Sequence, residues 1–211
     1  MEYLLTWQFL AIWFGWLMAG GSPGPATLSI AGTAMERGRK PAFFVSLGIL
    51  AGSATWGIAS ALGLGAVMLA NVWVFEVIRY LGAAYLLYLA VKALNQAFKG
   101  SKTLQGRTFS GGPKTLFVKG VALHLTNPKA ILSWASIYAI ILPADAPPSS
   151  LLICFVVLYS GSAFVFIGYA FLFSSAQVVA AYSRAQRLFN LAFAGFFGFA
   201  SFKILTAKLT Q

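Results

Sequence analysis

Long apolar stretches with few charged residues dominate this sequence and restrict what the chain can fold into. Six of them are long enough for a helix that crosses a bilayer, which needs about 20 mostly apolar residues. They cover residues 4–35, 42–70, 73–97, 118–142, 149–179 and 188–207. Only 9% of the residues are charged, against about 25% in a soluble domain. We therefore predict an all-α, polytopic membrane protein that lies in a lipid bilayer as a single domain, 1–211.

Several function classes lack their sequence signals. Cys154 is the only cysteine, so a redox pair of thiols within the chain is excluded. The sequence has no HExxH motif and no acidic pair for a metal, and no Gly-x-Ser-Gly motif for a serine hydrolase. We therefore expect no enzyme, no metal and no cofactor. A channel is also disfavoured, because neither a filter motif nor a ring-forming charged helix is present.

Basic residues gather in three of the loops between the apolar stretches. The net charge of +11 could indicate nucleic-acid binding, but this distribution instead follows the positive-inside rule of membrane proteins. We expect no nucleic-acid partner. The rule places the three basic loops in the cytoplasm and both termini outside. The residues of these loops and their flanks are Arg37, Arg39 and Lys40, then Lys92, Lys99, Lys102, Arg107, Lys114 and Lys119, and finally Arg184 and Arg187.

The predicted topology divides the chain into two halves of three spans each. Residues 1–98 form the first half, 99–118 a cytoplasmic loop and 119–211 the second half. Because three is an odd number, the halves have opposite orientations, as in transporters built from inverted repeats. The first span contains Pro23 and Pro25, and the fourth contains Pro128. Breaks in corresponding helices of the two halves indicate a transport site.

Both breaks have the residue order of a helix start. Asn127 precedes Pro128 as Ser22 precedes Pro23, with Asn or Ser as N-cap and Pro as first helical residue. Alternatively, Pro25 after Gly24 begins the second half-helix. Each break would expose free N–H groups and a positive helix end, which bind carboxylates. Freed carbonyls could accept hydrogen bonds from an ammonium group. The pairing matches a zwitterionic amino acid, and its predicted contacts are Ser22, Pro23, Gly24, Pro25, Ala26, Thr27, Asn127, Pro128, Lys129 and Ala130, with the carbonyl of His124.

Lys129 lies about ten residues into a span, where a charged residue is costly and by default functional. It could bind the substrate carboxylate or carry a proton. The alternative is a structural contact with a carbonyl or with a glutamate across the bundle. His124 precedes Asn127 by one helical turn and could relay protons, or be a hydrogen-bonded structural residue. Glu36 is the third candidate for proton coupling.

Gly48 and Gly52 form a small-xxx-small pattern that permits close helix packing. We interpret the pair as helix-packing residues rather than as a backbone-lined pathway. Ser53 follows directly and could face the transport cavity.

Together these motifs resemble the lysine exporter (LysE) superfamily, and within it the homoserine/threonine-resistance (RhtB) branch. The resemblance rests on Ser-Pro-Gly-Pro at 22–25, the glycine pair, the Arg-Tyr-Leu-Gly-Ala-Ala-Tyr segment at 79–85 and Leu-Thr-Asn-Pro-Lys-Ala at 125–130. It covers nearly the whole chain in the right order. It implies an inner-membrane amino-acid exporter driven by the proton-motive force, with a homodimer left open.

Two departures from the family pattern bear on substrate and coupling. Ser53 stands where the family often has Asp or His, so the coupling residue is open. Exporters of basic amino acids place an acid shortly after the Asn-Pro pair, where this chain has Ser133. A buried site for a basic side chain would need such an acid. We therefore favour neutral substrates such as threonine, homoserine or aliphatic amino acids; basic amino acids or a channel-like pore are the alternatives.

Overall fold

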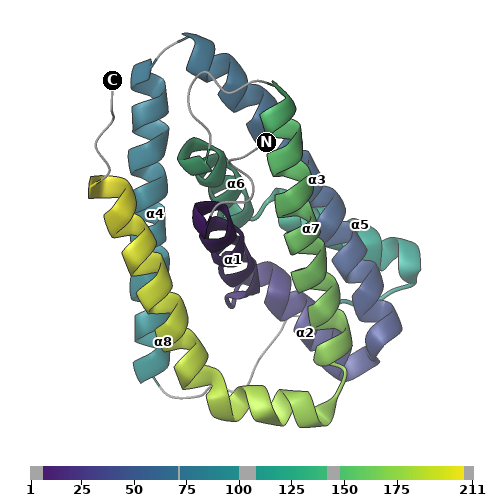
Figure 1. Ribbon diagram of the computed structural model, residues 1–211. Coiled ribbons are helices and arrows are strands. Elements are labelled where there is room, and N and C mark those ends of the chain that lie inside the picture. Colours follow the sequence, from purple (N-terminus) through teal and green to yellow (C-terminus); the bar gives the residue numbers. More distant parts are fainter. Residues whose placement is uncertain (1–6, 71, 100–107, 142–147, 207–211) are drawn as a thin grey trace.

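The computed structural model describes residues 7–70, 72–99, 108–141 and 148–206, and these form helices without any strand (Figure 1). This confirms the all-α class. The helices are α1 (Trp7–Gly21), α2 (Pro25–Arg37), α3 (Arg39–Ala70), α4 (Val72–Phe98), α5 (Pro113–Leu125), α6 (Pro128–Ile141), α7 (Pro148–Leu172) and α8 (Ala176–Thr206).

The chain breaks at both proline motifs. The first predicted span consists of α1 and α2, and the fourth consists of α5 and α6. None of these four helices exceeds 15 residues, or about 22 Å at 1.5 Å per residue, which is less than the hydrocarbon thickness of a bilayer. Among the described residues, three helices are long and apolar enough to cross a membrane: Arg39–Gly63 in α3, Ser149–Leu172 in α7, and α8.

Two predicted boundaries are wrong because hydropathy does not detect the polar turns of a helix. The fifth span does not extend to residue 179, since α7 ends at Leu172 and α8 begins at Ala176. Arg184 and Arg187 therefore lie on a helix rather than in a loop. The fourth span begins at Pro113 instead of 118, because Gly112 is extended and Pro113 is favoured as first helical residue. The predicted loop residues Lys102 and Arg107 lie outside the described part of the chain.

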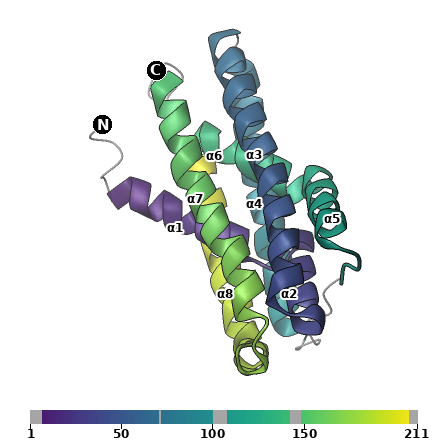
Figure 2. The same cartoon turned by 90° about the vertical axis from the view of Figure 1, so that its right-hand side faces the viewer.

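Two antiparallel helix pairs, α4 with α8 and α3 with α7, flank the shorter helices α1, α2 and α6 (Figure 1). Helix α5 packs against the outer side of α3, as the turned view makes clear (Figure 2). Both half-helix breaks thus lie inside the bundle. There they face protein rather than lipid, as broken backbone at membrane depth requires.

Glycines bring α3 and α5 into close contact. A Cβ atom on Gly48 would overlap the carbonyl oxygen of Phe117 and lie 3.0 Å from the Cα of Gly120. One turn further, a Cβ on Gly52 would lie 2.9 Å from the Cβ of His124. The missing side chains let the two backbones touch, and the contact holds His124 against α3.

The basic segments meet at one end of the molecule, at the bottom of Figure 1. The Arg37 guanidinium donates hydrogen bonds to the carbonyls of Phe109 (2.8 Å) and Gly111 (3.2 Å). Arg39 Nε donates to Ser174 Oγ at 2.9 Å. The start of α3, the segment before α5 and the turn before α8 therefore share this end, which agrees with basic segments gathered on one side.

Candidate functional site

The first break starts a new helix at Pro25. Gly24 is extended (φ −164°, ψ 177°) and caps α2, with Pro25 as first helical residue. Thr27 Oγ1 accepts a hydrogen bond from the Gly24 N–H at 3.0 Å. Of the two predicted starts, the one at Pro25 is correct. Ser22 is not the N-cap of α2. Gly24 precedes Pro25 and therefore avoids the α region, so the helix cannot begin before Pro25 and Gly24 is its cap. The Ser22 hydroxyl instead donates to the Ala19 carbonyl at 3.0 Å.

The second break follows the predicted cap at Asn127. The Lys129 N–H donates to Asn127 Oδ1 (3.1 Å) and the Ala130 N–H to the Asn127 carbonyl (3.0 Å). Pro128 has no N–H to offer. The amides predicted to hold a carboxylate here are therefore already engaged, because the capping residue itself satisfies them. The His124 carbonyl, predicted to accept from an ammonium group, likewise accepts from the Asn127 N–H at 3.2 Å.

The start of α2 is different. Within the described residues, the N–H groups of Ala26 and Thr27 form no hydrogen bond. Both residues are buried and line a cavity. The two breaks are thus unequal, with free donors at the first and an internally satisfied cap at the second. An anion in this cavity would find its backbone donors on α2.

Lys129 reaches from α6 to the first break. Its Nζ lies 2.6 Å from Ser22 Oγ and 2.9 Å from the Ser22 carbonyl oxygen. A Cβ on Gly24 would lie only 3.4 Å from the same Nζ. The contact fits the alternative in which the Lys129 ammonium group makes a structural hydrogen bond to a carbonyl. It also leaves an ammonium group beside the positive end of α2 with no carboxylate partner among the described residues, an arrangement that an anion would stabilise.

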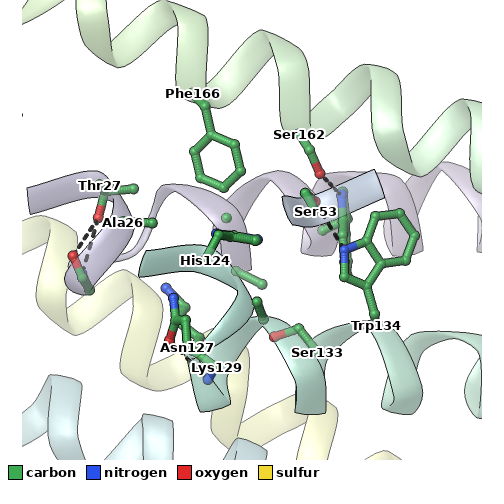
Figure 3. Close-up of a pocket in the computed structure, with 15 residues that line it drawn as sticks. Ala26, Thr27, Ser53, His124, Asn127, Lys129, Ser133, Trp134, Ser162 and Phe166 are labelled. Carbon is green, nitrogen blue, oxygen red and sulfur yellow. Dashed lines mark hydrogen bonds between the residues drawn. The ribbon is translucent and has the colours of Figure 1, made fainter. Parts of the chain in front are cut away.

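A small polar cavity of about 40 Å³ joins these groups. Space of this size holds about three water molecules. The close-up shows Lys129 and Asn127 on one side, Thr27 across from them, and Ser53, Trp134 and Ser162 at the far end (Figure 3). Its polar lining side chains are Thr27, Ser53, His124, Asn127, Lys129, Ser133 and Ser162.

Two of the three proton-coupling candidates meet at this cavity. His124 is only 4% exposed, lies edge-on to Phe166 at 5.6 Å between ring centroids, and has an Nδ1 atom with no partner among the described residues. It lines the cavity together with Lys129. Glu36 is exposed in the last turn of α2, 11 residues or about 16 Å from the helix start, and does not line the cavity.

The sequence does not predict the wall at the far end of the cavity, away from Lys129. Trp16 Nε1 donates to Ser162 Oγ at 2.9 Å, and Trp134 Nε1 donates to Ser53 Oγ at 3.0 Å. The two indole rings pack edge to face, 4.5 Å between centroids. Tryptophan and serine in apolar stretches carry no motif, so only the three-dimensional arrangement reveals that Trp16, Trp134 and Ser162 line the cavity.

Comparison with known proteins identifies the family of the chain. A family model described as LysE type translocator matches residues 10–208. The chain belongs to this family. No solved structure matches the chain.

Relatives of this LysE-type translocator include membrane and efflux proteins of bacteria. An uncharacterized membrane protein of Pseudomonas aeruginosa is 32% identical over 197 residues, which are 89% of this chain and 90% of the relative. The leucine efflux protein of Salmonella typhimurium is 32% identical over 127 residues, 59% of this chain and 58% of that protein. The match to the leucine efflux protein therefore spans little more than half of either chain.

Asn127→Ala should destabilise the LysE-type fold by about 1 kcal/mol, the usual cost of losing an N-cap side chain. The Lys129 N–H would lose its acceptor at 3.1 Å, and α6 would fray where it carries Lys129. Thermal unfolding in detergent, followed by circular dichroism, measures the loss. Asn127→Ser keeps a capping oxygen and should stay near wild type; equal stability of the alanine and serine variants would contradict the capping role.

Proposed function

We propose that the protein is a secondary active exporter of neutral amino acids. One observation carries the proposal: the Lys129 ammonium reaches the open N-terminus of α2 inside a buried polar cavity. Cation, free N–H groups and nearby hydroxyls form the complement of a zwitterion. Family membership and the leucine efflux proteins among the relatives support the same substrate class.

The proposed architecture is six membrane spans in two inverted repeats. Helices α1 and α2 correspond to α5 and α6, α3 to α7, and α4 to α8, with residues 99–112 joining the repeats. Support comes from the paired breaks and from the antiparallel α3–α7 and α4–α8 pairs, each of which joins corresponding helices. The shared basic end supports cytoplasmic loops, and with it both termini outside a bacterial inner membrane.

In the proposed mechanism the substrate enters from the cytoplasm and its carboxylate binds at the N–H groups of Ala26 and Thr27, beside Lys129. Its ammonium group donates hydrogen bonds to cavity hydroxyl oxygens such as those of Ser133 and Ser162. One repeat then rocks against the other and opens the cavity outward. Proton antiport through Lys129 or His124 then returns the bundle to the state that is open to the cytoplasm. Both side chains line the same cavity.

The cavity also bears on the alternative substrates. No acidic side chain lines it among the described residues, so the second cation of a lysine or arginine substrate would find no counter-charge there. Burying a charge without a partner is costly. This favours neutral substrates over basic ones.

Inverted membrane vesicles test the function. With an imposed proton gradient, we expect vesicles that contain the protein to accumulate labelled leucine above the level of vesicles without it. Unlabelled lysine should not compete. Collapse of the gradient with an ionophore should abolish accumulation; uptake that ignores the gradient would instead indicate a channel, and no uptake of any amino acid would contradict the proposal.

A further inference from the structure

A second cavity lies beside the polar one, between α1, α4, α6 and α8. Its volume is about 230 Å³. Ile12, Leu86, Ile137, Phe196 and Ile204 contribute apolar walls. No charged side chain lines it in the part of the chain that the structure describes.

The two cavities share part of their lining. Trp16, Ala19 and Ser133 belong to both, so the two cavities adjoin at these residues. Trp16 is 7% exposed and is fixed by its hydrogen bond to Ser162 and by the Trp134 ring. Trp16 is therefore fixed where the cavities adjoin, and the other two shared residues, Ala19 and Ser133, have small side chains.

The sizes of the cavities are complementary. A polar cavity of about 40 Å³ has room for a carboxylate and an ammonium group but not for a large side chain. An apolar cavity of about 150 Å³ is enough to hold benzene, and the second cavity here is larger. A branched aliphatic or aromatic side chain would fit.

We propose that the apolar cavity receives the side chain of a large neutral amino acid while its charged groups occupy the polar cavity. This inference rests on the proposed function and narrows its substrate class to residues such as leucine, isoleucine, methionine and phenylalanine. Small or hydroxylated amino acids such as alanine and threonine leave the apolar cavity partly unfilled. Each additional methylene buried there strengthens binding by up to about fourfold, so wild type should prefer leucine to alanine roughly 10- to 50-fold.

Ala200→Phe tests the assignment, because Ala200 lines the apolar cavity and not the polar one. The phenyl ring would occupy the space meant for the substrate side chain. We expect the leucine-to-alanine ratio of vesicle uptake rates to fall at least tenfold. Ala192→Phe is the matched control: Ala192 is exposed on the same helix and lines neither cavity, so its ratio should equal that of wild type.

Leu86→Ala gives a second measurement should the larger residue prevent folding. It enlarges the cavity and should shift preference from leucine toward phenylalanine. Unchanged ratios in both folded variants would overturn the inference alone; they would mean that a lipid chain or other apolar group fills this space. Absence of any amino-acid export by wild type would instead overturn the proposed function and the inference together.

Discussion

Replacing Lys129 by alanine should lower amino-acid export about a hundredfold at subsaturating substrate. The ammonium group is the cation that lies beside Gly24 and the start of α2, and in our proposal it pairs with the substrate carboxylate. Removing one partner of such a buried charge pair costs about 2–5 kcal/mol, where 1.4 kcal/mol is a factor of ten. Initial uptake rates of labelled leucine into inverted vesicles measure the loss.

Ser22→Ala is the matched control for Lys129→Ala. It removes the hydroxyl at 2.6 Å from Nζ but leaves the main-chain carbonyl at 2.9 Å, so the ammonium group keeps a partner. We expect a loss of about tenfold, because the carbonyl partner remains and the lost bond then contributes the lower end of the roughly 1.5–3 kcal/mol typical of hydrogen bonds to charged groups. Equal transport by Lys129→Ala and wild type, at equal amounts of folded protein, would show that the site is assigned to the wrong residue.

Lys129→Arg separates charge from proton transfer. Arginine keeps a cation for the carboxylate but does not give up its proton in proteins. If Lys129 carries the coupled proton, this variant should exchange labelled for unlabelled leucine yet fail to accumulate leucine in response to a proton gradient. Full gradient-driven accumulation by the arginine variant would assign the coupling to another group, with His124 the remaining candidate that lines the cavity.

The proline motifs made both helix breaks predictable, because proline removes a donor and restricts the residue before it. The motifs do not show that the two breaks differ in their free N–H groups. Asn127 was expected to cap α6, but a cap that satisfies the Lys129 and Ala130 amides also withdraws them from a ligand. Whether a side chain uses up the donors it caps depends on geometry, which residue order does not specify.

Long-range partners were equally beyond sequence reasoning. Lys129 was singled out as a costly intramembrane charge, yet its contact with Ser22 joins residues 107 positions apart. Trp16 and Ser162 are 146 positions apart. In an apolar helix, nearly every face is compatible with burial. The spacing of apolar residues therefore does not show which face points inward or which residues line a cavity. The sequence likewise does not show that Glu36, the third candidate for proton coupling, lies at the far end of α2, away from the cavity.

Gly48→Ala should destabilise the protein by about 2–3 kcal/mol, in the upper range for overpacking a tight contact. The added methyl group would overlap the Phe117 carbonyl oxygen, and backbone cannot rotate away as a side chain can. Gly120 lies across the same contact and is packed equally tightly, since a Cβ there would overlap the Val45 carbonyl oxygen. Helices α3 and α5 would have to separate.

The separation should affect transport as well as stability, because the same contact holds His124 against α3 beside Gly52. For a chain of this size, 2–3 kcal/mol corresponds to a lowering of the melting temperature by about 5–10 °C, measurable by thermal unfolding in detergent. Gly168→Ala is the control: it lies in α7 with nothing within 4 Å of a new Cβ, and alanine favours helix over glycine by about 1 kcal/mol. If both variants melted together with wild type, the glycines of α3 would not be needed for close packing, and His124 would owe its place to other contacts.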